Sequence, residues 1–336
     1  MTIQQSPSTI RTLTHRLPIC FLNMTTVLVT GGAGFIGTNL CRELLDDGKR
    51  VIAVDNFITS SKKNLSYLVD YKNIVFFPQD ITHNFSNELI KACKNVSMIF
   101  HLACPTGVAN LQKLAEEMLL TCSIGTYDIM QLAKKNNANV VFTSSSEVYG
   151  DPKVFPQDES YTGNVNPVGY RSPYEEGKRF SESIVRMFVT KYGVDAKIVR
   201  VFNTYGPYMS LNDSRVIPHF FKQLNANMPL TVTGDGKQTR TFCYVDDLVR
   251  GLLFVSKKGR KGEAYNLGND TEIPINDLAK LLLKIKKSKL KVLQIDRPPH
   301  DHQRRLPSLE KIKALGWKPE IGIEEGLQES LRWFGL

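Results

Sequence analysis

A glycine-rich turn between two short apolar runs constrains the fold of this chain more than any other segment. Residues 26–30 are rich in β-branched side chains and predict a buried strand, and Gly31-Gly32-Ala33-Gly34-Phe35-Ile36-Gly37 follows at once. A helical pattern then runs to Gly48, and a second apolar run, 50–54, ends in Asp55. Strand, glycine turn, helix, strand and acid in this order are typical of a dinucleotide-binding βαβ unit.

The residues of this unit also indicate which dinucleotide it would bind. Glycines permit a tight turn and a close approach of backbone to a pyrophosphate, and the amino end of the helix offers unpaired N–H groups. Asp55 can accept hydrogen bonds from both ribose hydroxyls and would repel a 2′-phosphate. We therefore expect NAD rather than NADP. The alternative interpretation is a glycine turn that binds no ligand.

Further strands and helices alternate along the chain. Apolar runs at 73–77, 96–103, 139–142 and 196–201 alternate with helical patterns, among them 111–135 and 172–192. Such alternation predicts an α/β fold, a doubly wound parallel Rossmann sheet covered on both faces. After Phe202 the pattern loosens into loop signals and shorter helices, which predict a smaller, mixed α/β C-terminal substrate lobe. We expect a disordered lead-in at 1–24, an NAD-binding domain at 25–203 to which 237–257 returns, and the substrate lobe mainly at 204–336.

A set of proton-handling side chains lies between residues 142 and 178. Ser144-Ser145-Ser146 ends the fifth predicted strand, and Glu147 follows. Ser172 is the predicted N-cap of the next helix, with Pro173 at the first helical position and Glu175 completing a capping box. Tyr174 and Lys178 then lie one turn apart on one face. An adjacent ammonium would lower the pKa of the phenol, although an isolated pair of this kind is more often a surface feature.

The composition excludes several other functions. Lysine and arginine number 43 against 33 acidic residues, a net charge of +10, but the densest basic run, 284–291, contains no aromatic residue for base stacking. An anionic cofactor and substrate explain the charge as well as nucleic acid would. The six cysteines show no paired metal or redox spacing, so we expect free thiols, no metal site and a cytoplasmic protein. No apolar run approaches the roughly 20 residues that cross a bilayer, so no membrane partner is expected.

The first two dozen residues differ from the rest. The first acidic residue of the chain is Glu43, and the segment before it carries Ser, Thr, Arg11 and Arg16. This composition faintly resembles an organellar transit peptide. A disordered lead-in, or an upstream start with Met24 as the natural beginning, is the interpretation we prefer.

Together these motifs resemble the extended short-chain dehydrogenase/reductases, which act on nucleotide sugars. The resemblance rests on Thr30-Gly31-x-x-Gly34-x-x-Gly37, Asp55, Ser144-Ser145 and Tyr174-x-x-x-Lys178, in this order, and covers about residues 25–335. Within that superfamily, Ser146-Glu147-Val148-Tyr149-Gly150-Asp151-Pro152 and Gln238-Thr239-Arg240 are similar to the UDP-glucuronate decarboxylase (UDP-xylose synthase) pattern. Epimerases usually carry a small residue at the position of Glu147, and 4,6-dehydratases carry Asp before it.

This resemblance implies an NAD-dependent carboxy-lyase that oxidises carbon 4 of UDP-glucuronate, releases carbon dioxide and re-reduces the product to UDP-xylose. The implied catalytic residues are Ser145, Glu147, Tyr174 and Lys178. The implied cofactor-binding residues are Gly31, Gly34, Phe35, Ile36, Gly37, Asp55, Asn56, Asp80, Ile81, Leu102, Ala103, Tyr174, Lys178 and Thr204. The implied substrate-binding residues are Asn203, Arg215, Arg240 and Arg305. A homodimer formed through the helices at 111–135 and 172–192 is implied as well.

Other functions of the same superfamily stay open at this point. A nucleotide-sugar 4,6-dehydratase or 4-epimerase would share the first oxidation, and a non-catalytic sugar-nucleotide-binding protein would share the fold. The chain departs from the decarboxylase pattern at Cys104-Pro105-Thr106-Gly107-Val108, at 115–120, at Cys122 in place of Asn, and at Tyr208 in place of Arg. The first three departures lie where the sugar would be held, so the identity of the sugar is the least determined feature.

Overall fold

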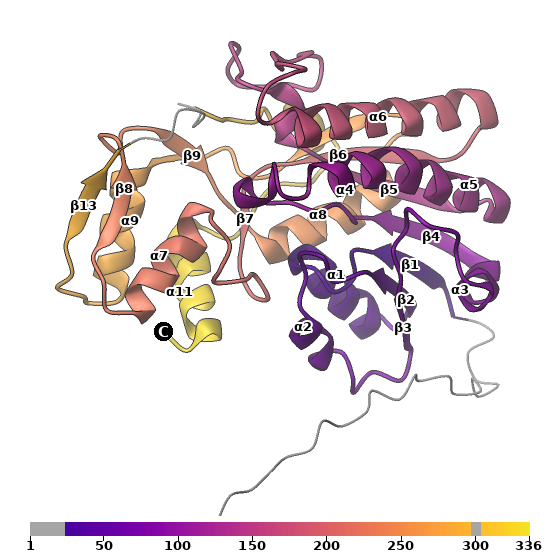
Figure 1. The fold of residues 1–336 in the computed structure, drawn as a ribbon, viewed down its shortest axis with the longest axis horizontal. Helices are drawn as coiled ribbons and strands as arrows, with labels where there is room; N and C mark the ends of the chain where they lie inside the picture. The colour runs from indigo at the N-terminus through magenta and orange to yellow at the C-terminus, as the bar shows by residue number, and fades with distance from the viewer. Residues whose placement is uncertain (1–23, 297–303) are drawn as a thin grey trace, which may run out of the picture.

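The chain folds around a seven-stranded parallel sheet (Figure 1). This computed structural model describes residues 24–296 and 304–336, so the lead-in expected at 1–24 lies outside the described residues except for Met24. The strands lie in the order β3-β2-β1-β4-β5-β6-β11, and every neighbouring pair is parallel. They are β1 (Thr26–Thr30), β2 (Arg50–Asp55), β3 (Ile74–Pro78), β4 (Val96–His101), β5 (Asn139–Ser145), β6 (Ala196–Val201) and β11 (Ala264–Leu267). The doubly wound parallel sheet predicted from the sequence is confirmed.

Helices cover both faces of this sheet because successive strand residues point to opposite sides. Val27 and Val29 pack into one core, against α1 (Phe35–Asp46), α8 (Val245–Lys258) and α10 (Glu310–Ala314). Leu28 packs into the other core, against α3 (Asn87–Ala92), α5 (Thr126–Asn136) and α6 (Ser172–Tyr192). The helix predicted at 111–135 is instead α4 (Ala115–Leu120), a π-helical turn at Thr121–Gly125, and then α5. α2 (Lys62–Ser66) lies beside α1.

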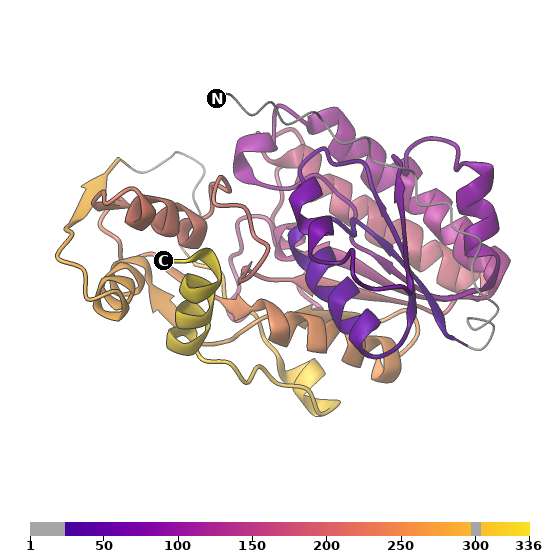
Figure 2. The same cartoon turned by 90° about the horizontal axis from the view of Figure 1, so that it is seen from below.

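The second lobe lies beside the main sheet (Figure 2) and has its own apolar core. That core is built from α7 (Val216–Asn225), α9 (Ile275–Ile285), α11 (Ile323–Phe334) and the parallel pair β8 (Leu230–Thr233) and β13 (Val292–Ile295). Two short pairs complete the lobe: β7 (Thr204–Tyr205) with β10 (Cys243–Tyr244), and β9 (Thr239–Thr241) with β12 (Glu272–Pro274). Within the segment 237–257, which was expected to return to the first domain, α8 packs against the main sheet, and β11 follows it as the edge strand beside β6.

The strand order places a ligand crevice at one edge of the sheet. β1 and β4 are neighbours, so the connections that leave their carboxyl ends run in opposite directions. Ligands of open α/β sheets bind at this switch point. Among the described helices, none is long and apolar enough to cross a membrane.

Candidate active site

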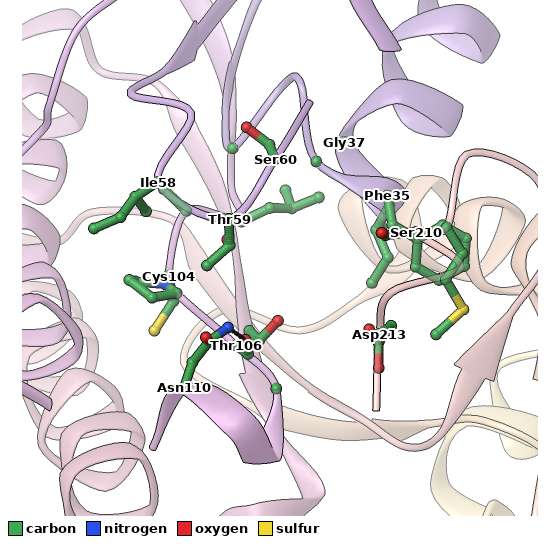
Figure 3. A pocket seen from close by; sticks show the side chains of 18 of the residues that line it. Phe35, Gly37, Ile58, Thr59, Ser60, Cys104, Thr106, Asn110, Ser210 and Asp213 are labelled. Carbon is green, nitrogen blue, oxygen red and sulfur yellow. Dashed lines mark hydrogen bonds between the residues drawn. The ribbon is translucent and has the colours of Figure 1, made fainter. Parts of the chain in front are cut away.

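A cavity of about 980 Å³ lies along the carboxyl ends of the sheet strands and is lined by both lobes. In Figure 3, Cys104, Thr106 and Asn110 form one side of the cavity, and Ser210 and Asp213 lie across from them. Most of the predicted site residues line this cavity: Gly31, Gly34, Phe35, Ile36, Gly37, Asp55, Asn56, Asp80, Ile81, Leu102, Ala103, Ser145, Glu147, Tyr174, Lys178, Asn203 and Arg215. Thr204, Arg240 and Arg305 are not among its lining residues.

The glycine turn has the shape that a pyrophosphate needs. Gly31 has φ of +73°, and a Cβ atom there would lie 2.9 Å from the backbone nitrogen of Ala103. A Cβ atom on Gly37 would lie 2.0 Å from the carbonyl oxygen of Gly31, so only glycine lets α1 begin this close to the turn. The N-cap residue of α1, Gly34, makes no side-chain cap. The first amide groups of α1 are therefore available to an anion.

Asp55 closes the turn from the end of β2. Its carboxylate accepts hydrogen bonds from Ala33 N (3.0 Å), Phe57 N (2.8 Å) and Ser60 Oγ (2.7 Å). A carboxylate offers about four acceptor positions, so this one is held rigidly and can still accept a ribose hydroxyl. Asn56 donates to Asp80 at 2.7 Å, which joins the ends of β2 and β3 at the same end of the cavity. These contacts fit the adenosine half of NAD.

Tyr174 and Lys178 face the cavity from the first turns of α6. Lys178 Nζ donates to the carbonyl oxygen of Thr143 at 2.8 Å and lies 6.0 Å from the centroid of the Tyr174 ring. Burial raises the pKa of Tyr174 to about 12, whereas the Lys178 ammonium and a hydrogen bond with Ser145 lower it. The ammonium thus acts in the direction predicted from the sequence. The net lowering expected there is wrong, because burial is the larger effect.

The start of α6 also differs from the sequence prediction. The helix begins at Ser172, but the N-cap residue is Arg171 and no side-chain cap is formed. The predicted capping box is absent because the Glu175 carboxylate accepts from Nε of Arg171 at 2.9 Å instead. Arg171 lines the cavity.

Glu147 lies between two arginines. Nη2 of Arg171 and Nη1 of Arg305 each form an ion pair with its carboxylate. Arg305 is only 3% exposed and also donates to the carbonyl oxygen of Gly150 at 3.1 Å. It therefore contacts Glu147 from the protein interior and does not line the cavity. Sequence reasoning missed Arg171, for which the only local signal was its place one turn before Glu175.

The predicted phosphate-binding residues are divided between two locations. Arg215, at the start of α7, lines the cavity and pairs with Asp213 through Nε (3.0 Å) and Nη2 (2.6 Å). Arg240 donates to the carbonyl oxygen of Thr239 at 2.8 Å and is not among the residues that line the cavity. Thr204 is buried and donates to the carbonyl oxygen of Phe202 at 3.0 Å, and it does not line the cavity.

Tyr208, which stands where the resemblance leads us to expect arginine, belongs to an aromatic cluster at the cavity edge. Its ring centroid lies 5.0 Å from that of Tyr67 and 5.2 Å from that of Trp333. All three residues line the cavity. The cluster joins the segment after α2 to the end of α11 and so connects the two lobes.

Cys104 and Cys122 meet beside Lys178. Their sulfur atoms are 3.6 Å apart, and Cys104 lines the cavity while Cys122 is buried behind it. A hydrogen bond with Cys104 and the charge of Lys178 lower the pKa of Cys122 to about 6 against the opposing effect of burial. Both cysteines remain thiols, as the sequence analysis predicted, but it did not anticipate their contact.

Comparisons with known proteins agree with this geometry. The profile of the NAD-dependent epimerase/dehydratase family matches residues 27–268. The chain belongs to this family. It is 40% identical over 303 residues to UDP-glucuronic acid decarboxylase 6 of Arabidopsis thaliana, which covers 90% of this chain and 86% of that protein.

Solved structures of the family share the fold over nearly the whole chain. A UDP-N-acetylglucosamine 4-epimerase from Methanobrevibacter ruminantium superposes with a TM-score of 0.85 at 28% identity, covering 93% of this chain and 99% of that one. A dTDP-glucose 4,6-dehydratase from Streptomyces venezuelae, with NAD bound, gives 0.83 at 29% identity, covering 93% and 97%. NAD is the cofactor of the family, and the glycine turn and Asp55 fit it.

We predict that Asp55→Asn weakens NAD⁺ binding about tenfold and makes NADP⁺ binding measurable. A hydrogen bond to a charged group contributes about 1.5–3 kcal/mol, and the negative charge that opposes a 2′-phosphate is lost. Isothermal titration with each dinucleotide measures both effects. Asp47→Asn, an exposed carboxylate at the far end of α1, serves as the control and should bind as the unaltered protein does. Unchanged selectivity in Asp55→Asn would contradict the assignment.

Proposed function

We propose that this chain is an NAD-dependent UDP-glucuronate decarboxylase that produces UDP-xylose. The observation that carries the proposal is Glu147, fixed by Arg171 and Arg305 beside Tyr174 and Lys178. By resemblance, a glutamate here separates the decarboxylases from the epimerases. The relatives named UDP-glucuronic acid decarboxylase, at 38–40% identity over most of the chain, support it.

The first role of the site is to remove a proton from the sugar. Tyr174, hydrogen-bonded by Ser145, accepts the proton of the hydroxyl on carbon 4, and the Lys178 ammonium stabilises the phenolate that carries the reaction. NAD, when bound along the glycine turn, supplies a hydride acceptor and donor. The protonated tyrosine returns the proton when the sugar is reduced again.

The second role is to hold the uronic acid while it loses carbon dioxide. Oxidation at carbon 4 places a carbonyl β to the carboxylate on carbon 5, and β-keto acids decarboxylate readily. Glu147 is the carboxylate placed to orient the ring and to handle the proton delivered to carbon 5. Its two arginine partners fix it in direction, which is the preorganisation that such a step requires.

The diphosphate of the substrate meets the second lobe. Arg215 presents its guanidinium at the start of α7, where the free amide groups of the first turn also favour an anion. Asp213 holds that guanidinium in a fixed direction. Asn203, at the end of β6, lies in the same wall and is the proposed contact to the nucleotide diphosphate.

The alternative is a 4,6-dehydratase or a 4-epimerase that shares the first oxidation. One observation favours it: the side chains facing the cavity from the loop after β4 include Cys104, Thr106 and Asn110, none of them cationic. A uronate carboxylate would then rely on Arg171 and Lys178. The identity of the product distinguishes these reactions directly.

We also propose that two copies associate through α4, α5 and α6. These helices pack side by side on one face of the sheet (Figure 1). Their outward surface exposes large apolar side chains, namely Leu119 (45%), Ile124 (46%), Tyr127 (40%) and Phe180 (56%). Large exposed apolar side chains gathered on one helical layer support an association site there. The proposed location is the cytoplasm, whose reducing conditions suit the free thiols found among the described residues.

Incubation of the purified protein with UDP-glucuronate should release carbon dioxide and UDP-xylose, identified by mass. The same protein is incubated in parallel with UDP-glucose and a TDP-hexose as controls. Loss of water from the TDP-hexose, or an isomeric product, would favour the dehydratase or epimerase. If the protein retains NAD but turns over none of these substrates, the proposal is contradicted.

Tyr174→Phe should lower kcat by a factor of about 10² to 10⁴ while the protein still binds NAD. The phenylalanine keeps the packing of α6 but cannot accept the carbon-4 proton, and general base catalysis typically contributes about this factor. Initial rates and the NAD content of the purified protein are the measurements.

Lys178→Met is the companion variant and tests the electrostatic role. Without the ammonium the pKa of Tyr174 rises further, so the ascending limb of the kcat/KM pH profile should move to higher pH. A profile that keeps its position in Lys178→Met, or normal turnover in Tyr174→Phe, would refute the assigned base.

Ile124→Glu together with Phe180→Glu should convert the proposed dimer to a monomer, because burying two carboxylates in an apolar interface is strongly unfavourable. Sedimentation velocity measures the change. Val69→Glu, at an apolar residue that is 66% exposed outside this helix face, is the matched control and should leave the dimer intact. A monomeric unaltered protein would overturn the proposed association.

A further inference from the structure

The contact between Cys104 and Cys122 has no role in the proposed reaction. Cys104 lies in the loop between β4 and the 3₁₀ turn at Val108–Asn110, and Cys122 lies in the π-helical turn between α4 and α5. The chain brings their sulfur atoms to 3.6 Å, at hydrogen-bond distance for two thiols. The other described cysteines, Cys41, Cys93 and Cys243, are each buried in an apolar core of the sheet.

The surroundings of the pair favour one negative charge shared between the two sulfur atoms. The hydrogen bond with Cys122 and burial raise the pKa of Cys104, whereas the hydrogen bond with Cys104 and the charge of the buried Lys178 lower the pKa of Cys122. The hydroxyl of Ser181 donates to the carbonyl oxygen of Cys122 at 2.6 Å and is also within reach of its sulfur. The two sulfur atoms share one hydrogen bond, in which either thiol can donate its proton to the other sulfur. Movement of that one proton transfers the charge to Cys104, which faces the cavity (Figure 3).

We propose that Cys104 and Cys122 form an oxidative modification site in the wall of the catalytic cavity. A hydroperoxide entering the cavity converts the two thiols to an intramolecular disulfide, and an external dithiol restores them. The disulfide reversibly stops turnover. This inference goes beyond the proposed reaction, because bond formation does not depend on which sugar the enzyme uses.

The chemistry balances with hydrogen peroxide as the oxidant. The Cys104 thiolate attacks one peroxide oxygen, the O–O bond breaks, and hydroxide leaves a sulfenic acid on Cys104. The hydroxide takes the proton of Cys122. The Cys122 thiolate then attacks the Cys104 sulfur, so that the S–S bond forms, the S–O bond breaks and a second hydroxide leaves. The two sulfurs lose two electrons, and the peroxide gains them.

The backbone on both sides can accommodate the bond. A disulfide is about 2.05 Å long, so the two sulfurs need to approach by about 1.5 Å. Residues 102–107 form neither helix nor strand, and a π-helical turn is a local irregularity in a helix. Closure fixes the cavity wall at Cys104 to the helix behind it and removes the thiolate beside Lys178. Both changes alter the place where the sugar is held.

The experiment treats the protein, with NAD bound, with graded hydrogen peroxide. Peptide mapping after alkylation of the remaining thiols should show a cross-link between Cys104 and Cys122, with the loss of two hydrogen atoms from the intact mass. Activity should fall in proportion to the fraction of cross-linked protein, by at least tenfold when the cross-link is complete. It should return with dithiothreitol. Mass mapping is independent of turnover, so failure of the decarboxylase assignment and failure of this proposal are distinguishable.

Two variants complete the test. In Cys104→Ala neither the sulfenic acid nor the cross-link can form, so the dithiothreitol-reversible part of the inactivation should disappear. Cys93→Ala removes a thiol buried away from the cavity and should respond to peroxide as the unaltered protein does. The proposal is overturned by oxidation of Cys104 without a cross-link to Cys122. It is equally overturned by a complete cross-link that leaves activity unchanged, or by reversible inactivation that persists in Cys104→Ala.

Discussion

The buried positive charge of Lys178 is the constraint around which the active site is arranged. The side chain is only 3% exposed, and an isolated ammonium in such surroundings would lose its proton. Burial does act to lower the pKa of Lys178, but Cys104, Cys122 and Tyr174 outweigh it and the pKa is raised. The carbonyl oxygen of Thr143 adds a direct hydrogen bond. The charge is thus stable only where β5, α6 and the cysteine pair meet, and that meeting point is where the substrate proton is removed.

A second electrostatic contact joins the two lobes over the same site. Glu147 follows β5 in the first lobe, whereas Arg305 comes from the C-terminal part of the chain and is buried beneath it. Removing one partner of a buried ion pair typically destabilises a protein by about 3–5 kcal/mol. Gln157 reinforces the contact through backbone and side-chain hydrogen bonds to Leu306. The carboxylate assigned to the sugar is therefore fixed by the same interactions that hold the lobes together.

The sequence was sufficient to predict the fold and the nucleotide end of the site because both depend on local patterns. Buried parallel strands are continuous apolar runs, and the Gly31–Gly37 turn and Asp55 lie within one βαβ unit. The sugar end depends on contacts that no spacing reveals. Arg171 was missed because its partner Glu147 lies in another segment. Thr204, expected at the cofactor, is buried outside the cavity lining, and its hydroxyl donates to the carbonyl oxygen of Phe202.

The departures from the family pattern are compensated within the chain, which explains how the fold tolerates them. Cys122 stands where an asparagine is usual, and the thiol of Cys104 supplies a hydrogen-bond partner at 3.6 Å. Tyr208 stands where an arginine is usual, and the rings of Tyr67 and Trp333 pack against it. In each case the departing residue makes a contact with a neighbour in or behind the cavity wall. Because Tyr174, Lys178 and Glu147 are all retained, the redox and proton chemistry can persist while the groups that meet the rest of the substrate change.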